Sequence, residues 1–145
     1  MLPSKQRLVP LIDIGANLGH PQLSRDAHEF DNMLRRAEAV GVRDIVVTGT
    51  SMRSSRDAVK LCREYNGAKD GERAKALRLT CTVGVHPHDA KDFDLVRTPP
   101  LMSELLADAN VVAVGECGLD FNRNFSPQDV QIAVFEVRYL LNVDA

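Results

Sequence analysis

Four short runs of apolar, mostly β-branched residues recur along this chain at a nearly constant spacing. They begin at residues 11, 44, 79 and 111, so successive starts lie 33, 35 and 32 residues apart. Each run is typical of a buried strand, and the runs cover residues 11–14, 44–49, 79–85 and 111–115. Because a segment with helical periodicity follows each run, the sequence predicts an α/β protein with a parallel sheet.

The expected helices begin at residues that can cap a helix, namely Asp26, Ser54, Thr98 and Ser126. We expect the third helix to bury Leu101 and Met102. The fourth is apolar around most of its circumference over residues 130–141, which predicts that more protein surrounds it. The polar residues 67–75 are expected to form a solvated insertion.

The strand spacing predicts part of a TIM (β/α)₈ barrel. Such a barrel uses about 250 residues for eight units, and this chain supplies four units of similar length. A complete four-stranded, doubly wound sheet also fits the length. Alternation along the strands places Thr80, Thr82 and His86 on one face of the third strand, and Val114 and Glu116 on the matching face of the fourth. Polar groups then gather toward the carboxyl ends, as at the mouth of a barrel, and this favours the barrel.

Composition excludes several classes of protein. The 145 residues suit a single domain, and 18 basic against 20 acidic residues provide no diffuse positive field to attract polyanions. No apolar run reaches the length of about 18 residues that a membrane span needs, and the first ten residues lack the core of a signal peptide, so we expect a cytosolic or nuclear protein without membrane contact. Cys62, Cys81 and Cys117 are too widely spaced for a zinc ribbon and are expected to be buried thiols.

Glu116 is the strongest candidate for a functional group. It follows an uncharged run, residues 111–115, so its carboxylate needs a partner. A hard divalent cation such as Mg²⁺ would provide one. The alternative is a buried glutamate paired with an arginine or lysine of a neighbouring strand.

Two further candidates lie at the ends of other strands. Asp13 is the charged residue of the first run and is expected near the barrel mouth, where it either takes part in chemistry or fixes the following turn. His86 could ligate a metal, donate to a phosphate oxygen or transfer a proton, unless its role is structural. His88 lies beyond a proline and is expected to face solvent.

The loop over residues 118–125 combines a basic group, amides and two aromatic rings. Arg123 could hold a phosphate, and Phe121 or Phe125 could stack on a base. Equally, both rings could cap the barrel. Motifs for dinucleotide binding or for an acyl-enzyme are missing.

Four segments, at residues 11–18, 45–50, 83–89 and 112–123, together resemble the TatD-type deoxyribonucleases. The last two, GVHPHD within the third segment and VAVGECGLDFNR, are the most specific. The resemblance implies a metal-dependent TIM barrel of the amidohydrolase superfamily. It also implies hydrolysis of phosphodiester bonds in DNA, commonly 3′-to-5′ from single strands or DNA ends, with Mg²⁺ or alternatively Mn²⁺ or Zn²⁺.

For particular positions, the resemblance implies that Glu116 is a metal ligand and that His86 lies at the rim of the active site. From their places at strand ends and in the loop, we expect His86 and Asp13 to be catalytic. We expect Asn17, Asn122 and Arg123 to bind substrate. Many relatives carry a His-x-His pair after the first strand, and this chain has glycine and asparagine there. It therefore resembles the branch without that pair.

The family's remaining metal ligands, two histidines and an aspartate, come from the second half of the barrel. We therefore expect residues 1–145 to be a single incomplete domain, the N-terminal half. The first hypothesis is that these residues are the N-terminal half of a metal-dependent nuclease, which is active as the complete enzyme. The alternatives are an inactive half-barrel or interaction module that self-associates through its exposed sheet edges, and a metal-dependent amide or ester hydrolase of the same superfamily.

Overall fold

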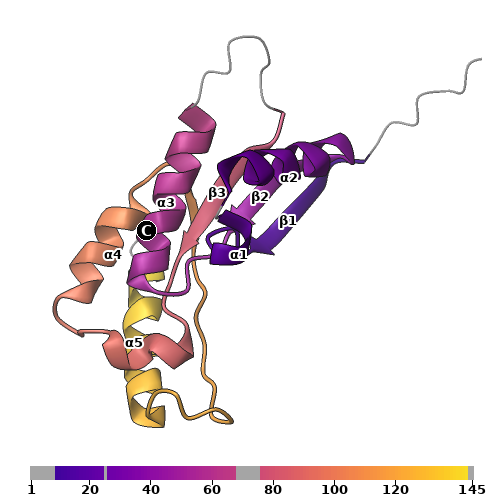
Figure 1. Cartoon of the computed structure of the whole chain (residues 1–145). Coiled ribbons are helices and arrows are strands. Elements are labelled where there is room, and N and C mark those ends of the chain that lie inside the picture. Colours follow the sequence, from indigo (N-terminus) through magenta and orange to yellow (C-terminus); the bar gives the residue numbers. More distant parts are fainter. Residues whose placement is uncertain (1–8, 25, 68–75, 144–145) are drawn as a thin grey trace, which may run out of the picture.

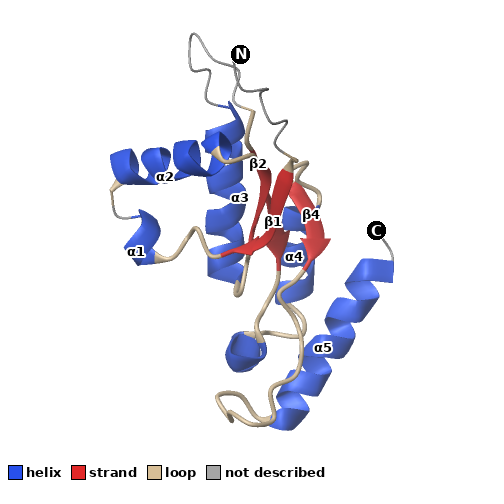
Figure 2. Ribbon diagram, turned by 90° about the vertical axis from the view of Figure 1, so that its right-hand side faces the viewer, coloured by secondary structure: helices blue, strands red, loops and turns tan. Residues whose placement is uncertain are grey.

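A parallel sheet of four strands forms the centre of the protein. The computed structural model describes residues 9–24, 26–67 and 76–143. Its strands are β1 (Leu11–Ala16), β2 (Val42–Val47), β3 (Arg78–Val83) and β4 (Val111–Val114), shown in Figures 1 and 2. All four predicted strands are confirmed, although β2 and β3 begin and end earlier than expected. The predicted insertion lies outside the described residues, apart from Gly67.

The order of the strands identifies the architecture. The sheet runs β1-β2-β3-β4, and each neighbouring pair is parallel. A doubly wound sheet needs a reversal of strand order, which sends helices to both faces. Here the order never reverses, so right-handed crossovers place the connecting helices on one side, as in a barrel. The partial barrel is therefore confirmed, and the doubly wound alternative is wrong.

The helices of the described residues alternate with the strands. They are α1 (Pro21–Ser24), α2 (Ala27–Ala39), α3 (Met52–Gly67), the 3₁₀ helix η1 (Pro87–Asp92), α4 (Thr98–Leu106) and α5 (Gln128–Val143). The short elements α1 and η1 were not predicted. No helix in the described part of the chain is long and apolar enough to cross a bilayer.

The predicted helix starts differ in outcome. Asp26 caps α2 as expected, because its carboxylate accepts from the backbone N–H groups of His28 and Glu29 at 2.9 and 3.1 Å. Thr98 is the first residue of α4 rather than its cap, and its hydroxyl accepts from the N–H of Asp94. α3 begins two residues before Ser54.

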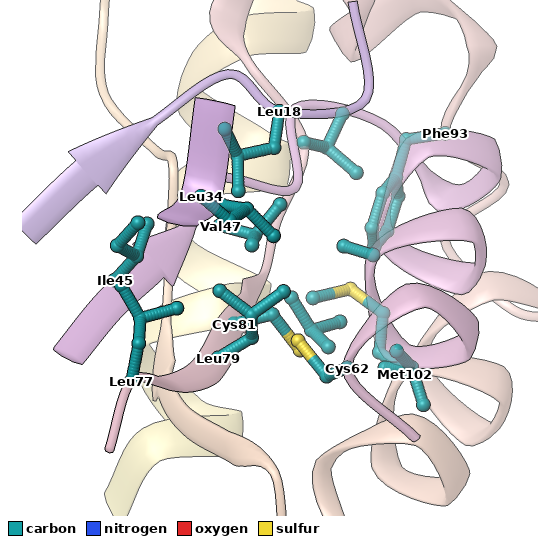
Figure 3. Close-up of a cluster of buried hydrophobic side chains, with 14 of the residues drawn as sticks. Leu18, Leu34, Ile45, Val47, Cys62, Leu77, Leu79, Cys81, Phe93 and Met102 are labelled. Carbon is teal, nitrogen blue, oxygen red and sulfur yellow. The ribbon is translucent and has the colours of Figure 1, made fainter. Parts of the chain in front are cut away.

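The core lies between the strands β2 and β3 and the helices α2, α3 and α4 (Figure 3). Leu79 and Met102 are completely buried there, together with the thiols of Cys62 and Cys81. A hydrogen bond with Cys81, together with burial, raises the pKa of Cys62 far above its ordinary value, so this thiol stays protonated. The prediction of buried thiols is thus confirmed for these two.

Three expectations about burial are corrected. Cys117 is exposed, because it follows the end of β4 on the surface. Leu101 is also exposed, since α4 turns Met102 rather than Leu101 into the core. Ser126 does not start α5, because its buried hydroxyl bonds to another segment.

The outer strands remain largely uncovered in the described protein. On β1, Leu11, Ile12 and Ile14 are exposed, and so is Val112 on β4. Ile132 and Phe135 on α5 are partly exposed as well. Apolar side chains therefore meet solvent on the faces that a closed barrel would cover.

Candidate active site at the carboxyl ends of the strands

Close backbone approaches fix the carboxyl ends of β3 and β4. The N–H of Gly115 donates to the carbonyl of Val83 at 2.9 Å, and the N–H of Glu116 donates to the carbonyl of Gly49 at 3.0 Å. A Cβ atom on Gly84 would lie only 1.9 Å from the carbonyl oxygen of Gly115, so a side chain there has no space. These contacts hold Glu116 at the rim of the sheet.

A buried serine secures the same region from the helix side. The hydroxyl of Ser55 on α3 is completely buried, and it lies 3.1 Å from the N–H and 3.2 Å from the carbonyl oxygen of Gly84. It can accept from the first and donate to the second. The turn after β3 is thereby joined to α3.

An open cavity of about 460 Å³ lies in front of these strand ends. Its lining combines hydroxyl, amide and carboxylate oxygens from all four strand ends: Ile14, Gly15, Asn17, Thr48, Thr82, Gly115 and Glu116. The structure therefore brings together two of the predicted site residues, Asn17 and Glu116. Their convergence follows from the common edge at which parallel strands end.

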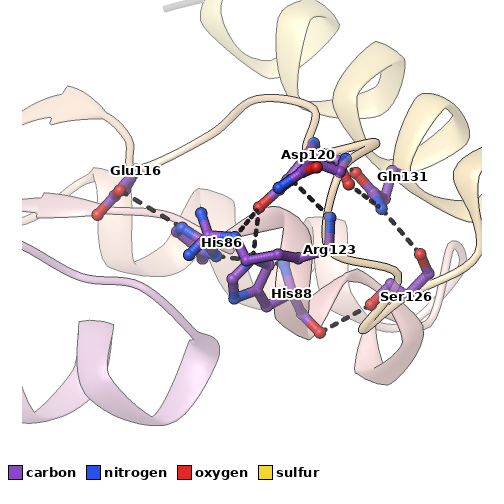
Figure 4. A network of polar contacts seen from close by, with 8 residues as sticks. His86, His88, Glu116, Asp120, Arg123, Ser126 and Gln131 are labelled. Carbon is purple, nitrogen blue, oxygen red and sulfur yellow. Dashed lines mark hydrogen bonds and ion pairs between the residues drawn. The ribbon is translucent and has the colours of Figure 1, made fainter.

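Glu116 faces His86 across this edge (Figure 4). The Oε1 atom of Glu116 lies 3.7 Å from Nε2 of His86, and 46% of the glutamate side chain is exposed. The alternative of a buried glutamate is thus wrong. The Nδ1 atom of His86 accepts from the N–H of His88 at 3.2 Å, so the neutral ring carries its proton on Nε2, toward Glu116.

His88 does not face solvent, contrary to the prediction. Its Nε2 atom lies 2.7 Å from Oδ2 of Asp120, and about a fifth of its side chain is exposed. Asp120 also accepts from Nε of Arg123 at 2.8 Å. The bond from His88 contributes most, followed by the N–H of Arg123, to lowering the pKa of Asp120 far below 3.8. Asp120 therefore stays charged through the neutral range.

Two buried side chains fasten the loop that carries Asp120, which spans residues 117–127 (Figure 4). Gln131 accepts from the N–H of Asp120 at 2.8 Å and donates to the carbonyls of Asp120 and Ser126 at 3.1 and 2.8 Å. Ser126 donates to the carbonyl of His88 at 2.8 Å. The 117–127 loop is thus tied both to α5 and to the segment after β3.

Comparison with known proteins matches this arrangement to one family. The profile described as TatD related DNase matches residues 12–141. The chain belongs to this family. It is similar to the "3'-5' ssDNA/RNA exonuclease TatD" of Escherichia fergusonii, with 41% identity over 86% of this chain and 42% of the relative. The Escherichia coli protein of the same name is 37% identical over 92% of this chain and 46% of its own.

Solved structures agree with the fold. A TatD family hydrolase from Entamoeba histolytica superposes with a TM-score of 0.80 at 27% identity, covering 93% of this chain and 46% of its own. An amidohydrolase from Saccharomyces cerevisiae, at 24% identity and a TM-score of 0.72, supports the fold alone. The chain spans about half the length of the curated relatives that it matches.

The remaining predicted residues of this TatD-family chain lie away from the cavity lining. The carboxylate of Asp13 accepts from the N–H of Gly15 at 3.1 Å, which fixes the turn toward Asn17. Asn122 and Arg123 lie in the exposed 117–127 loop, where their N–H groups both donate to Asp120. The structure therefore joins Arg123 to the His88 side of the site rather than to Glu116.

The oxygen atoms that line the cavity are suitable for part of the coordination shell of a hard divalent cation. Such ions prefer carboxylate and other oxygen ligands, which Glu116 and its hydroxyl-bearing neighbours present. Within the described residues, no three His, Cys, Asp or Glu side chains gather closely enough to hold a metal.

Proposed function

We propose that this chain forms one side of the active site of a metal-dependent nuclease that hydrolyses phosphodiester bonds in single-stranded DNA. The observation that carries the proposal is the pair formed by Glu116 and His86 at an open cavity, in a chain of the TatD-related DNase family. Relatives that share about 40% identity are named as 3′-5′ exonucleases of single-stranded DNA and RNA. The 3′-to-5′ polarity is part of the proposal.

Glu116 would hold the divalent cation, with Mg²⁺ first and Mn²⁺ or Zn²⁺ as alternatives. A cation bound there supplies positive charge that offsets the charge developing on the phosphate oxygens. The half-exposed carboxylate supports this role, because it is held by its backbone while its oxygens reach the cavity.

His86 would be the proton-bearing group at the scissile phosphate. Its Nδ1 atom is engaged by the N–H of His88, so Nε2 is the atom that can donate to a phosphate oxygen. Asn17 would orient the substrate from the opposite side of the cavity through its amide. Asp13 would position the turn that presents Asn17, which is the role its hydrogen bond supports.

Arg123 and Asn122 would bind the backbone of the strand beyond the scissile bond. Arg123 keeps 61% of its side chain exposed while its Nε atom bonds Asp120, so the side chain is both held in place and open to solvent. Arginine held in this way can donate to phosphate without losing further conformational entropy.

The test is hydrolysis of a fluorescently labelled single strand, with and without Mg²⁺, by a protein in which this chain is extended to the length of its curated relatives. Glu116→Gln should lower the rate by about 100-fold or more, as expected for loss of a group that stabilises the transition state. Glu104→Gln, at an exposed position of α4, is the matched control and should leave the rate unchanged. Chelation by EDTA should stop hydrolysis, and Mg²⁺ should restore it. Equal rates for Glu116→Gln and the wild type would contradict the assignment.

A second candidate, an interaction module that self-associates, is favoured by one specific observation. Ile12 and Ile14 on β1 and Val112 on β4 are exposed, although strands seldom leave such side chains in solvent. Sedimentation of the chain should then depend on concentration, and Ile12→Lys should shift it to the monomer. Mg²⁺-dependent hydrolysis by a monomer would exclude this candidate as the main function.

We also propose that the protein is located in the cytoplasm. Cell fractionation tests this location.

A further inference from the structure

The 117–127 loop is held rigidly beside the candidate site. Asp120 receives the N–H groups of Asn122 and Arg123, while Gln131 bonds the backbone of Asp120 on both its N–H and its carbonyl. Ser126, completely buried, joins the end of the loop to His88. Side chains exposed on this loop are therefore held in place by its backbone.

A line of contacts runs from the candidate metal ligand to an aromatic ring on this loop. His86 lies against Glu116, and its ring meets the ring of His88 edge to face at 4.3 Å between centroids. His88 in turn packs against Phe125 at 4.6 Å, with the ring planes tilted by 49°. Because each ring supports the next, Phe125 has a fixed position relative to the site.

Phe125 nevertheless stays open to solvent. It is 58% exposed even though it packs on His88, and Phe121 in the same loop is 46% exposed. Within the described residues, neither ring is enclosed by other side chains. A large ring that is supported on one side and open on the other resembles the stacking platforms of proteins that bind single strands.

We propose that Phe125 is a stacking platform for an unpaired nucleobase of the substrate, next to the phosphate that Glu116 and His86 address. The inference rests on the proposed function and adds to it a binding site for one base of the single strand. A base in a duplex is already stacked on both faces, so it cannot lie on Phe125 without being extruded. Arg123, exposed on the same loop, would take the phosphate that follows.

A unique fluorophore tests the contact directly. The sequence contains no tryptophan, so Phe125→Trp introduces a single indole at the platform. A phosphorothioate oligothymidylate, which resists hydrolysis, should quench its emission, whereas an abasic strand with the same backbone should not. Val40→Trp is the matched control, because Val40 is also exposed and lies at the C-cap of α2, at the opposite end of the sheet. Its emission should stay unchanged with both strands.

Affinity separates stacking from general apolar contact. Phe125→Ala should weaken binding of the oligothymidylate by about 5- to 100-fold. Phe125→Leu, which keeps an apolar side chain against His88 and so preserves folding, should weaken it similarly. Neither change should alter the weaker binding of the abasic strand.

The outcomes for the platform and for the nuclease differ. Full affinity for the oligothymidylate in Phe125→Leu, or no quenching in Phe125→Trp, would overturn the platform. If Glu116→Gln still abolishes hydrolysis in that case, the proposed function stands. Base-dependent quenching without Mg²⁺-dependent hydrolysis would instead support the stacking role of Phe125 and contradict the proposed nuclease function.

Discussion

The amino and carboxyl ends of the sheet both carry polar side chains, but they use them differently. At the amino end, Asn66 accepts from the N–H of Leu79 at 3.1 Å and donates to its carbonyl at 2.7 Å, so the amide closes the start of β3. At the carboxyl end, the backbone of Glu116 is held by Gly49 while its side chain reaches a cavity. The first arrangement stabilises a strand, and the second presents a carboxylate at a cavity.

The acidic groups show the same contrast. Asp108, near Asn66, is almost buried and pairs with Arg63. The N–H of Asn110 contributes most to lowering its pKa, so the charge serves the local structure. Glu116 instead keeps nearly half of its side chain exposed. We therefore expect substitutions of polar side chains at the amino end to change stability, and substitutions of polar side chains that line the cavity to change activity.

The largest expected effect comes from Gly84→Ala, which attacks the backbone contact beneath the carboxyl end. The added Cβ would lie 1.9 Å from the carbonyl oxygen of Gly115, and backbone atoms cannot yield as a side chain can. The free energy of unfolding should fall by about 3 kcal/mol in urea denaturation, at the upper end for overpacking. Gly19→Ala, with no atom within 4 Å of its Cβ, should change it by less than about 1 kcal/mol. Equal stability of the two variants would refute the close approach.

Asn66→Ala should have the next largest effect, and only on stability. It removes both bonds to Leu79, a residue with no exposed surface, and leaves buried backbone groups without those partners. The expected loss is about 1–3 kcal/mol in the same denaturation experiment. Asn124→Ala, at an exposed position in the 117–127 loop, should be nearly neutral. If Asn66→Ala also changed the affinity for the cation or the oligonucleotide, the amino end would contribute to binding, which would contradict the expected difference between the two ends.

The strands and their barrel-like order could be predicted because these features depend on patterns within short segments of the sequence. Uncharged runs of β-branched residues mark the strands, and one right-handed crossover per unit gives a sequential order without further information. The early start of β2 at Val42 was missed because the charged Arg43 separates Val42 from the predicted run, which begins at Asp44. Glu116 and Asn17 could be predicted to converge since both follow strand ends of one sheet.

The His88–Asp120 bond could not be predicted, because it joins residues 32 positions apart through the path of a loop. The prediction that Ser126 starts a helix was wrong for a related reason. A serine before a proline is a common helix start, but here its hydroxyl bonds the carbonyl of His88, 38 positions away. In both cases a tertiary contact overrides a local signal. These contacts are the ones that place Phe125 and Arg123.

Acid should weaken the tie between the 117–127 loop and His88. The folded protein lowers the pKa of Asp120 below the ordinary value of 3.8, so its carboxylate stabilises the fold above that value. This contribution should be lost as the pH falls from about 4 through the lowered pKa, because protonation then favours the unfolded chain. Thermal melts between pH 5 and 2 should therefore decline more steeply for the wild type than for Asp120→Asn. Parallel curves would mean that Asp120 contributes no proton linkage.

The smallest expected effect on stability belongs to Glu116→Gln, and its smallness is what the contrast between the two ends requires. The side chain is nearly half exposed, and the contact from Glu116 to Gly49 uses the backbone, which the substitution keeps. The free energy of unfolding should therefore change by less than about 0.5 kcal/mol, while hydrolysis falls by the factor given above. If Glu116→Gln instead lost as much stability as Asn66→Ala, the carboxylate would be part of the scaffold. Polar side chains at both ends of the sheet would then serve to stabilise the fold. The argument for a ligand at the cavity would rest on His86 and Asn17 alone.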